Sequence, residues 1–167
     1  YSGKCLVNSV DGHPEKQDEI FPMVKRFGTS VIVLPMGDRV PETARERLQA
    51  LETILRRLDE EGIPRTHVIV DCLALVVSAM QEASRQTLET ISLVKSEFQL
   101  PTLLGLSNVS FGLPQRKWVH NSFLAMAIGR GLDAALLNPA TPETHQTIAA
   151  SSLFGGKDPG CQRYLAF

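Results

Sequence analysis

Five short apolar runs, spaced along the chain, constrain the fold more than any other feature of the sequence. Each run is rich in β-branched or aliphatic residues and is continuously apolar, whereas a strand with one solvent-exposed face alternates apolar and polar residues. Continuous runs of this length indicate strands of a parallel sheet that is buried on both faces. The runs are residues 4–10, 30–36, 67–73, 102–107 and 133–138.

Stretches with helical periodicity separate these runs. The clearest covers residues 42–61, where apolar residues recur every three or four positions and charged residues cover the other side. Pro41 precedes this stretch, and Gly62 and Pro64 follow it, as expected at helix ends. Further helices are expected at residues 84–98 and 115–130, with weaker patterns at 18–27 and 142–154. The alternation of strand and helix predicts a parallel α/β fold.

The chain length limits the number of strand–helix units. One unit needs roughly 30 or more residues, so a chain of 167 residues holds about five units in one domain. A closed eight-unit barrel needs about 250 residues. Two architectures therefore remain, a doubly wound five-stranded sheet that is complete in itself and the last five units of an eight-unit barrel. The abrupt start at Tyr1, close to an apolar run, suggests a piece of something longer.

Charge and cysteine content narrow the classes of function. Lys and Arg total 17 and Asp and Glu total 18, for a formal charge of −1, and no basic stripe occurs. A nucleic-acid partner is therefore not expected. The cysteines Cys5, Cys72 and Cys161 are scattered and lack zinc-ligand spacing, which favours free thiols and a reducing, cytoplasmic setting. No apolar run is long enough to suggest a membrane span.

Amide or carboxylate side chains stand at or near the ends of four of the apolar runs. They are Asn8, Asp71, Asn108 and Asn138. The carboxyl ends of parallel strands share one edge of the sheet, so these side chains converge where α/β folds bind ligands. Each alone is more simply explained as a cap of the following helix or turn. Asn8, Asp71 and Asn108 together favour a ligand site.

The chemistry of such a site suits a neutral heterocycle. A carboxylate accepts two parallel hydrogen bonds from a ring N–H and an exocyclic amine, and each Asn adds a donor and an acceptor. Signatures of other classes are missing, because the sequence has no P-loop, dinucleotide fingerprint, zinc-ligand spacing or GxSxG elbow. Hydrolase and metalloenzyme functions are therefore disfavoured.

A specific sequence signature lies in residues 103–127. This segment, LLGLSNVSFGLPQRKWVHNSFLAMA, closely resembles the LGLSNxSxGLPxR…NxxFLxMA stretch of methyltetrahydrofolate:corrinoid methyltransferases. That family includes the folate-binding module of cobalamin-dependent methionine synthase. Other segments agree in order and spacing, so that the resemblance covers nearly the whole chain. They are KCLVNSVDG, VIVLPMGDRVPETARERL, VIVDCL, GLDAALLNP and GKDPGCQRYL.

The resemblance implies a TIM-type, pterin-binding (β/α)8 barrel in which residues 1–167 form the carboxy-terminal portion, strands four to eight. By the same match, Asn8 and Asp71 would hold the pterin ring, with Gly105 and Ser107 beside it. Asn108 would lie next to N5, which carries the methyl group, and would act in catalysis. Possible accessory residues are Arg116, Asn121 and Asn138.

The function implied by the resemblance is methyl transfer between N5 of methyltetrahydrofolate and the cobalt of a corrinoid. Tetrahydrofolate would be the substrate, and a separate partner protein would carry the corrinoid, a cobalamin. The chain departs from the family because the first three units are not in it and because Phe111 stands where some members have Gln. A homodimer would cover the exposed edge of the first strand present.

Three alternatives stay open. The chain is a non-catalytic or truncated pterin-binding module, an enzyme similar to dihydropteroate synthase, or an unrelated five-stranded α/β domain in which the Asn residues are caps. Ser107-Asn108-Val109 replaces the Ser-Arg-Lys motif of the synthases, which disfavours the second alternative. Folate binding would separate the third alternative from the pterin-binding ones.

Overall fold

One parallel sheet organises the chain. The computed structural model describes residues 2–166 and contains a sheet of five strands. They are β1 (Leu6–Val10), β2 (Ser30–Val33), β3 (Val68–Asp71), β4 (Thr102–Gly105) and β5 (Ala134–Leu136). The strands are all parallel and pair in sequence order. A doubly wound sheet places its first strand between two others, so the observed order excludes that architecture.

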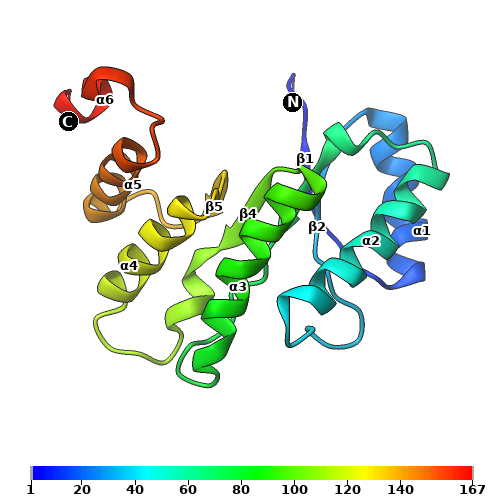
Figure 1. Ribbon diagram of the computed structural model, residues 1–167. Helices are drawn as coiled ribbons and strands as arrows, with labels where there is room; N and C mark the ends of the chain where they lie inside the picture. The colour runs from blue at the N-terminus through cyan, green and yellow to red at the C-terminus, as the bar shows by residue number, and fades with distance from the viewer. Residues whose placement is uncertain (1, 167) are drawn as a thin grey trace.

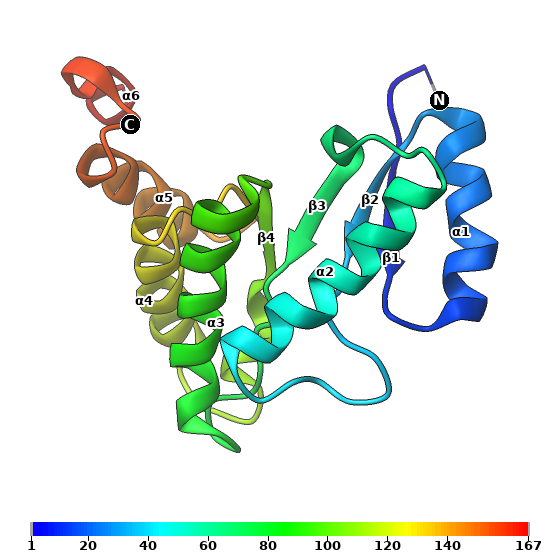
Figure 2. The same cartoon turned by 45° about the vertical axis from the view of Figure 1, so that its right-hand side comes forward.

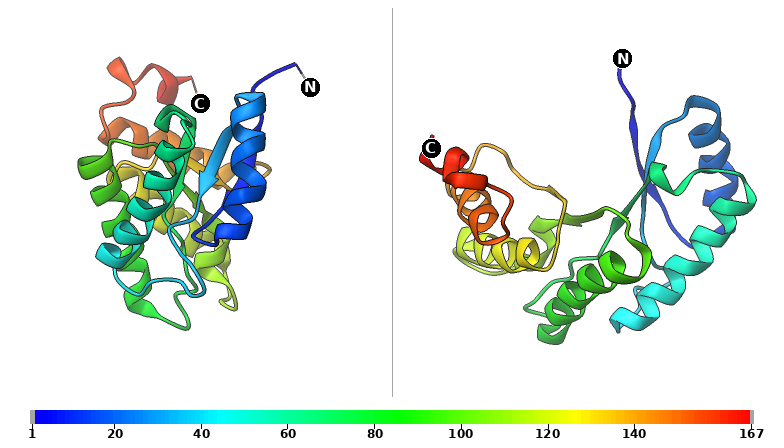
Figure 3. Two further views of the ribbon diagram at one scale, coloured as in Figure 1. Left: turned by 90° about the vertical axis from the view of Figure 1, so that its right-hand side faces the viewer. Right: turned by 45° about the horizontal axis from the view of Figure 1, so that its top comes forward.

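The sheet is curled, and helices cover its outer face (Figures 1 and 2). The right-hand panel of Figure 3 shows an open curve, with the helices along its outside. The inner side opens between the amino-terminal strand and the carboxy-terminal helices. Right-handed crossovers between sequential parallel strands put every connecting helix on the same side of a sheet. The result is an α/β half-barrel, which is consistent with part of a TIM-type barrel.

A helix occurs in each stretch where the sequence predicts one. The helices are α1 (Pro14–Phe27), α2 (Ala44–Glu60), α3 (Gln81–Leu93), α4 (Arg116–Gly129) and α5 (Pro142–Phe154). The first begins earlier than expected because proline is tolerated in the first helical turn. The third continues into a π-helical turn, η2 (Val94–Phe98), which completes the stretch predicted at 84–98. The short helix α6 (Gln162–Leu165) was not predicted.

All five strands are shorter than the apolar runs that predict them. β4 ends at Gly105, after which the chain turns into a 3-10 helix, η3 (Leu106–Ser110). Asn108 therefore lies in a turn rather than directly at a strand end. β5 covers only residues 134–136. Two further 3-10 turns, η1 (Arg65–His67) and η4 (Pro159–Cys161), precede β3 and α6.

The core lies between the outer face of the sheet and the helices. Helix α2 begins with a capping box, in which Thr43 and Glu46 each accept a hydrogen bond from the other's backbone N–H. Its apolar side is fully buried and belongs to the same cluster as the outward-facing strand residues. The buried α2 residues include Leu51, Leu55 and Leu58, and the strand residues include Val31, Val33, Val68 and Val70.

No helix within residues 2–166 is long and apolar enough to cross a membrane. Cys5 and Cys161 are exposed free cysteines, and Cys72 is a buried one.

Truncating Leu55 should destabilise the half-barrel. Leu55 has no exposed surface, so Leu55→Ala removes apolar contacts and leaves a cavity that costs about 2–5 kcal/mol of unfolding free energy. Glu52→Ala, an exposed change on the same helix, should alter that free energy by less than about 0.5 kcal/mol. Urea denaturation followed by circular dichroism compares the two, and equal effects would contradict the assignment of the core.

Candidate functional site

The inner face of the half-barrel carries every second strand residue. Strand residues that face the helices belong to the core cluster, whereas Ile32 and Leu103, between them in sequence, are buried but lie outside it. Pairing aligns Asn8 with Ile32 and Asp71 with Leu103. Gly105 follows Leu103 by two positions. Asn8, Asp71 and Gly105 therefore share the inner face of the sheet.

Asp71 is the last residue of β3 and is half-buried. Its Oδ1 accepts a hydrogen bond from the backbone N–H of Leu73 at 2.9 Å. Burial raises the pKa of this carboxyl group, while the Leu73 N–H and the positive charge of Arg47 oppose the rise. Asp71 is thus a carboxylate on the inner face that keeps one oxygen, Oδ2, outside this local turn.

Asn8 is the middle residue of β1 rather than its end. The strand continues to Val10, with an irregular register between Asn8 and Val10 and a cis peptide bond between Asn8 and Ser9. The Asn8 side chain is exposed on the inner face. It lies in the row of Ile32 and Ile69, one inward-facing position before Asp71.

Asn108 lies over Gly105, in the turn that follows β4. A Cβ atom built on Gly105 would stand 3.3 Å from Asn108 Nδ2, which is tighter than ordinary contact. Because a side chain at position 105 would point to the inner face, the Asn108 amide also lies on that face. Glycine at position 105 leaves room for this amide.

An arginine from α4 holds the turn that carries Asn108. Arg116 donates from Nη2 to the carbonyl of Ser107 at 2.7 Å and from Nε to Ser110 Oγ at 2.9 Å. His120 Nε2 lies 2.6 Å from the same hydroxyl. Burial and the neighbouring Arg116 lower the pKa of His120, which favours its neutral form. The turn between Ser107 and Ser110 is therefore fixed at both ends.

The remaining candidate residues divide between two places. Ser107, Arg116 and Asn138 line a common cavity of about 340 Å³. Asn138 also accepts a hydrogen bond from the backbone N–H of Ala140 at 3.0 Å, the turn-forming contact that the capping explanation expects. Asn121 lies elsewhere, between α4 and α5, where its Oδ1 accepts from Thr144 Oγ1 at 3.2 Å. The structure does not bring Asn121 to the inner face.

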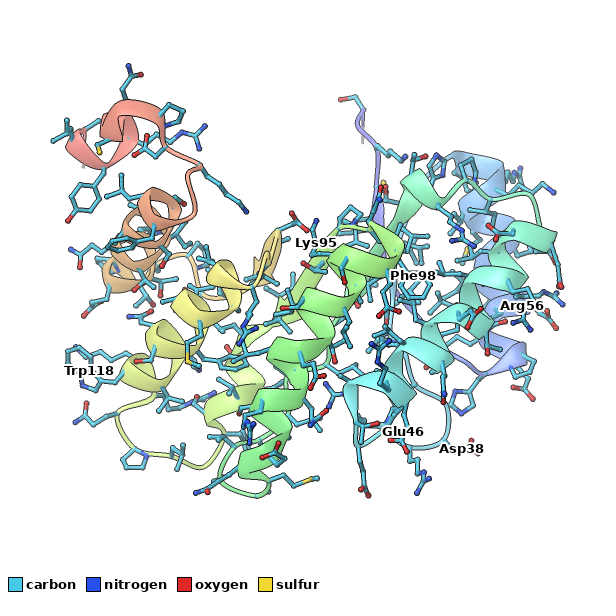
Figure 4. All side chains as sticks on the ribbon, in the orientation of Figure 1. Asp38, Glu46, Arg56, Lys95, Phe98 and Trp118 are labelled. Carbon is cyan, nitrogen blue, oxygen red and sulfur yellow. The ribbon has the colours of Figure 1, made fainter. Side chains whose placement is uncertain are left out.

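A polar cluster missed by the sequence reasoning joins the loops after β1 and β2. His13 donates its backbone N–H to Asp11 Oδ1 at 3.1 Å, and its ring nitrogens lie 2.8 Å from that atom and 3.1 Å from Asp38 Oδ1. Lys16 donates to Asp11 Oδ2 at 3.0 Å. Figure 4 shows Asp38 near the lower edge of the molecule, well below Lys95, which pairs with Asp133 at the amino end of β5.

This cluster lies at the carboxyl end of the sheet, where the loops of α/β folds meet ligands. Burial works to raise the pKa of Asp11, but the hydrogen bonds from His13 and Lys16 lower it overall. Asp11 and then Asp38 raise the pKa of His13 through their hydrogen bonds to the ring. The position of Asp11, directly after the first apolar run, is the sequence signal that could have found the cluster.

Removing Asp38 should lower the pKa of His13. The protonated His13 ring donates to both Asp11 and Asp38, and these contacts contribute their full stability at a pH below the ordinary histidine pKa. They are lost as the pH rises through the raised pKa of His13. NMR titration of the His13 ring should give a lower pKa in Asp38→Asn, with Asp11 still holding Nδ1. Glu52→Gln, an exposed change on α2, serves as the control. If the pKa of His13 is the same in Asp38→Asn and in the native chain, Asp38 does not bind the ring.

The sequence of this chain is similar to a known protein family and to several known proteins. A family model described as "Pterin binding enzyme" matches residues 1–138. The chain is 30% identical over 150 residues to a methionine synthase of Mycobacterium leprae, an alignment covering 81% of this chain and 12% of that protein. It is 28% identical over 173 residues to a methionine synthase of Mycobacterium tuberculosis, covering 91% of this chain and 14% of the relative.

A third relative is a methylcorrinoid:tetrahydrofolate methyltransferase of Eubacterium limosum. The two are 23% identical over 165 residues, which is 95% of this chain and 60% of the relative. The chain thus spans between 12% and 60% of the length of these three relatives.

Proposed function

Because this chain belongs to the pterin-binding enzyme family, we propose that it forms strands four to eight of a (β/α)8 barrel that binds tetrahydrofolate on its inner face. The proposed reaction is methyl transfer between N5 of methyltetrahydrofolate and the cobalt of a corrinoid that a partner protein carries. One observation carries this proposal, namely that Asn8, Asp71 and the Asn108–Gly105 pair share one face of the sheet.

Asp71 is the proposed anchor of the pterin ring. A carboxylate accepts from a ring N–H and an exocyclic amine together, and half-burial strengthens such bonds relative to water. Asp71 shares the inner face of the sheet with Asn8, which adds one donor and one acceptor. Gly105 is proposed to contribute by leaving room for the Asn108 amide on this face, beside the ring.

Asn108 is the proposed catalytic residue. N5 is a poor leaving group as a neutral amine, so its bond to the methyl group breaks readily only when N5 gains a proton or a strong hydrogen bond. An amide does not ionise, but a fixed amide dipole stabilises charge that changes on N5 in the transition state. The corrinoid cobalt supplies the methyl-accepting and methyl-donating chemistry when its carrier protein is bound.

The neighbouring residues support this arrangement. Arg116 fixes the Ser107–Ser110 turn, so that Asn108 is held before a ligand arrives. Ser107 and Asn138 line the cavity beside the turn and are proposed as accessory contacts. Asn121 is proposed to act only by joining α4 to α5.

A second candidate function is a folate-binding module without catalysis. Methyl transfer to a supplied corrinoid protein separates the two functions, since a module of this kind binds tetrahydrofolate without transferring its methyl group.

Two further parts of the proposal concern assembly and setting. Leu6 on β1 and Leu136 on β5 are 44% and 46% exposed at the two edges of the sheet. Covering such edges favours association of two chains, which sedimentation would detect as a dimer. Free thiols favour a reducing, cytoplasmic setting.

Asp71→Asn should weaken tetrahydrofolate binding while leaving the fold intact. The amide keeps the shape but turns one acceptor into a donor that faces a donor. Hydrogen bonds to charged groups contribute about 1.5–3 kcal/mol, so the expected loss of affinity is about ten- to a hundredfold. Calorimetric titration measures this, with the exposed Asp18→Asn as the matched control. Equal affinity of Asp71→Asn and the native chain would rule out Asp71 as the anchor.

Asn108→Ala should lower the rate of methyl transfer more than it lowers folate affinity. Its contact with N5 strengthens only as charge develops, so the loss falls mainly on the rate. Losing one such positioned donor typically costs about a hundred- to a thousandfold in rate. Cobalt absorbance follows transfer, and the titration above measures affinity. Parallel losses in rate and affinity would mean that Asn108 only binds.

A further inference from the structure

A buried arginine lies behind the strand end that carries Asp71. Arg47, near the start of α2, is 0% exposed. Its Nη1 donates to the carbonyls of Cys72 at 3.0 Å and Leu73 at 3.2 Å, and its Nε donates to the carbonyl of Pro41 at 3.2 Å. All of these acceptors are neutral. The guanidinium therefore binds the backbone that follows β3 and, among residues 2–166, has no carboxylate partner in its hydrogen bonds.

The backbone held by Arg47 has an unusual conformation. Leu73 has a φ of 59°, in the left-handed region that residues other than glycine seldom adopt. Its carbonyl also accepts from the Thr87 hydroxyl at 2.9 Å, and its N–H donates to Asp71 Oδ1. Residue 73 is thus held at its carbonyl by α2 and α3, and its N–H in turn fixes the Asp71 carboxylate.

We infer that Arg47 is a positioning residue for Asp71, which fixes the orientation of the carboxylate through the Cys72–Leu73 backbone and favours its ionised form by its charge. The inference rests on the proposed function, in which Asp71 anchors the pterin ring. Arginine suits this role because its planar guanidinium donates from two nitrogens held at a fixed separation, from Nη1 to the carbonyls of Cys72 and Leu73 and from Nε to that of Pro41. An ammonium group has one nitrogen and cannot reach both places.

The electrostatic part of the inference agrees with the surroundings of Asp71. Burial raises the pKa of Asp71, and the Leu73 N–H and the Arg47 charge both act against it. The adjacent Cys72 is buried, and burial followed by the nearby Asp71 charge raises the pKa of its thiol, so Cys72 stays neutral near Asp71. The pKa of Asp71 is raised overall, and the Arg47 charge lowers it against the effect of burial.

Two substitutions separate orientation from charge. Arg47→Met removes both, and we expect a higher pKa of Asp71 together with a loss of tetrahydrofolate affinity of about ten- to a hundredfold. Arg47→Lys keeps the charge and loses the fork, so affinity should fall while the pKa of Asp71 moves less than in the Met variant. Arg45→Met is the matched control, because Arg45 lies on the same helix, is exposed and pairs with Glu97.

The pKa of Asp71 is measured by NMR of its labelled carboxyl carbon, which needs no ligand, and affinity is measured by titration with tetrahydrofolate. Should the Met variant not fold, the native chain supplies a second measurement. The Arg47 Nε–H resonance should shift with pH at the midpoint of Asp71, and this shift should vanish in Asp71→Asn.

An Asp71 titration that is the same in the native chain and in folded Arg47→Met would overturn the inference, as would an Arg47 resonance that does not respond to Asp71. A native chain that binds no tetrahydrofolate overturns the proposed function instead, so the two failures are distinguishable.

Discussion

Sequential parallel pairing of the strands determines where everything else in this chain lies. Each strand pairs with its successor, so every crossover turns the same way and the helices gather on the outer face. That face is covered by the apolar sides of the helices, and the other face carries Asn8 and Asp71. A sheet with its strand order reversed at one point would have covered both faces with helices and buried these polar groups.

The two turns that carry Asp71 and Asn108 are held in the same manner. An arginine from the helix layer donates to backbone carbonyls in each turn, Arg47 after β3 and Arg116 after β4. Arg47 thereby holds the left-handed backbone at Leu73, whose N–H donates to Asp71 in the turn. Arg116 holds the turn in which the Asn108 amide packs closely over Gly105. A ligand that meets groups already held in place pays less ordering entropy on binding, which favours a rigid binding face.

Much of this arrangement could be predicted from the sequence, because it follows from local periodicity. Features that depend on tertiary contacts could not. The continuous apolar runs predict the five strands, and the leucine spacing of α2 predicts its buried side, because both follow from local periodicity. The order of pairing is a tertiary property, so the pattern alone left the barrel and the doubly wound sheet equal, and the family resemblance favoured the barrel. The same resemblance predicts a role for Asn108, but no local signal shows that β4 ends at Gly105 and passes into a 3-10 turn. Arg47 was overlooked although it stands four residues before Leu51, on the apolar side of α2, where a charged residue is itself a signal.

The central claim is that the inner face of this half-barrel binds a pterin, and side-chain NMR tests it most directly. Tetrahydrofolate added to the labelled native chain should shift the side-chain amide signals of Asn8 and Asn108 and the backbone amide of Gly105, all with one dissociation constant. The Asn121 amide, which lies between α4 and α5, should stay unchanged. Shifts confined to Asn121 and its neighbours, or no saturable shift at Asn8, Asn108 and Gly105, would contradict the account.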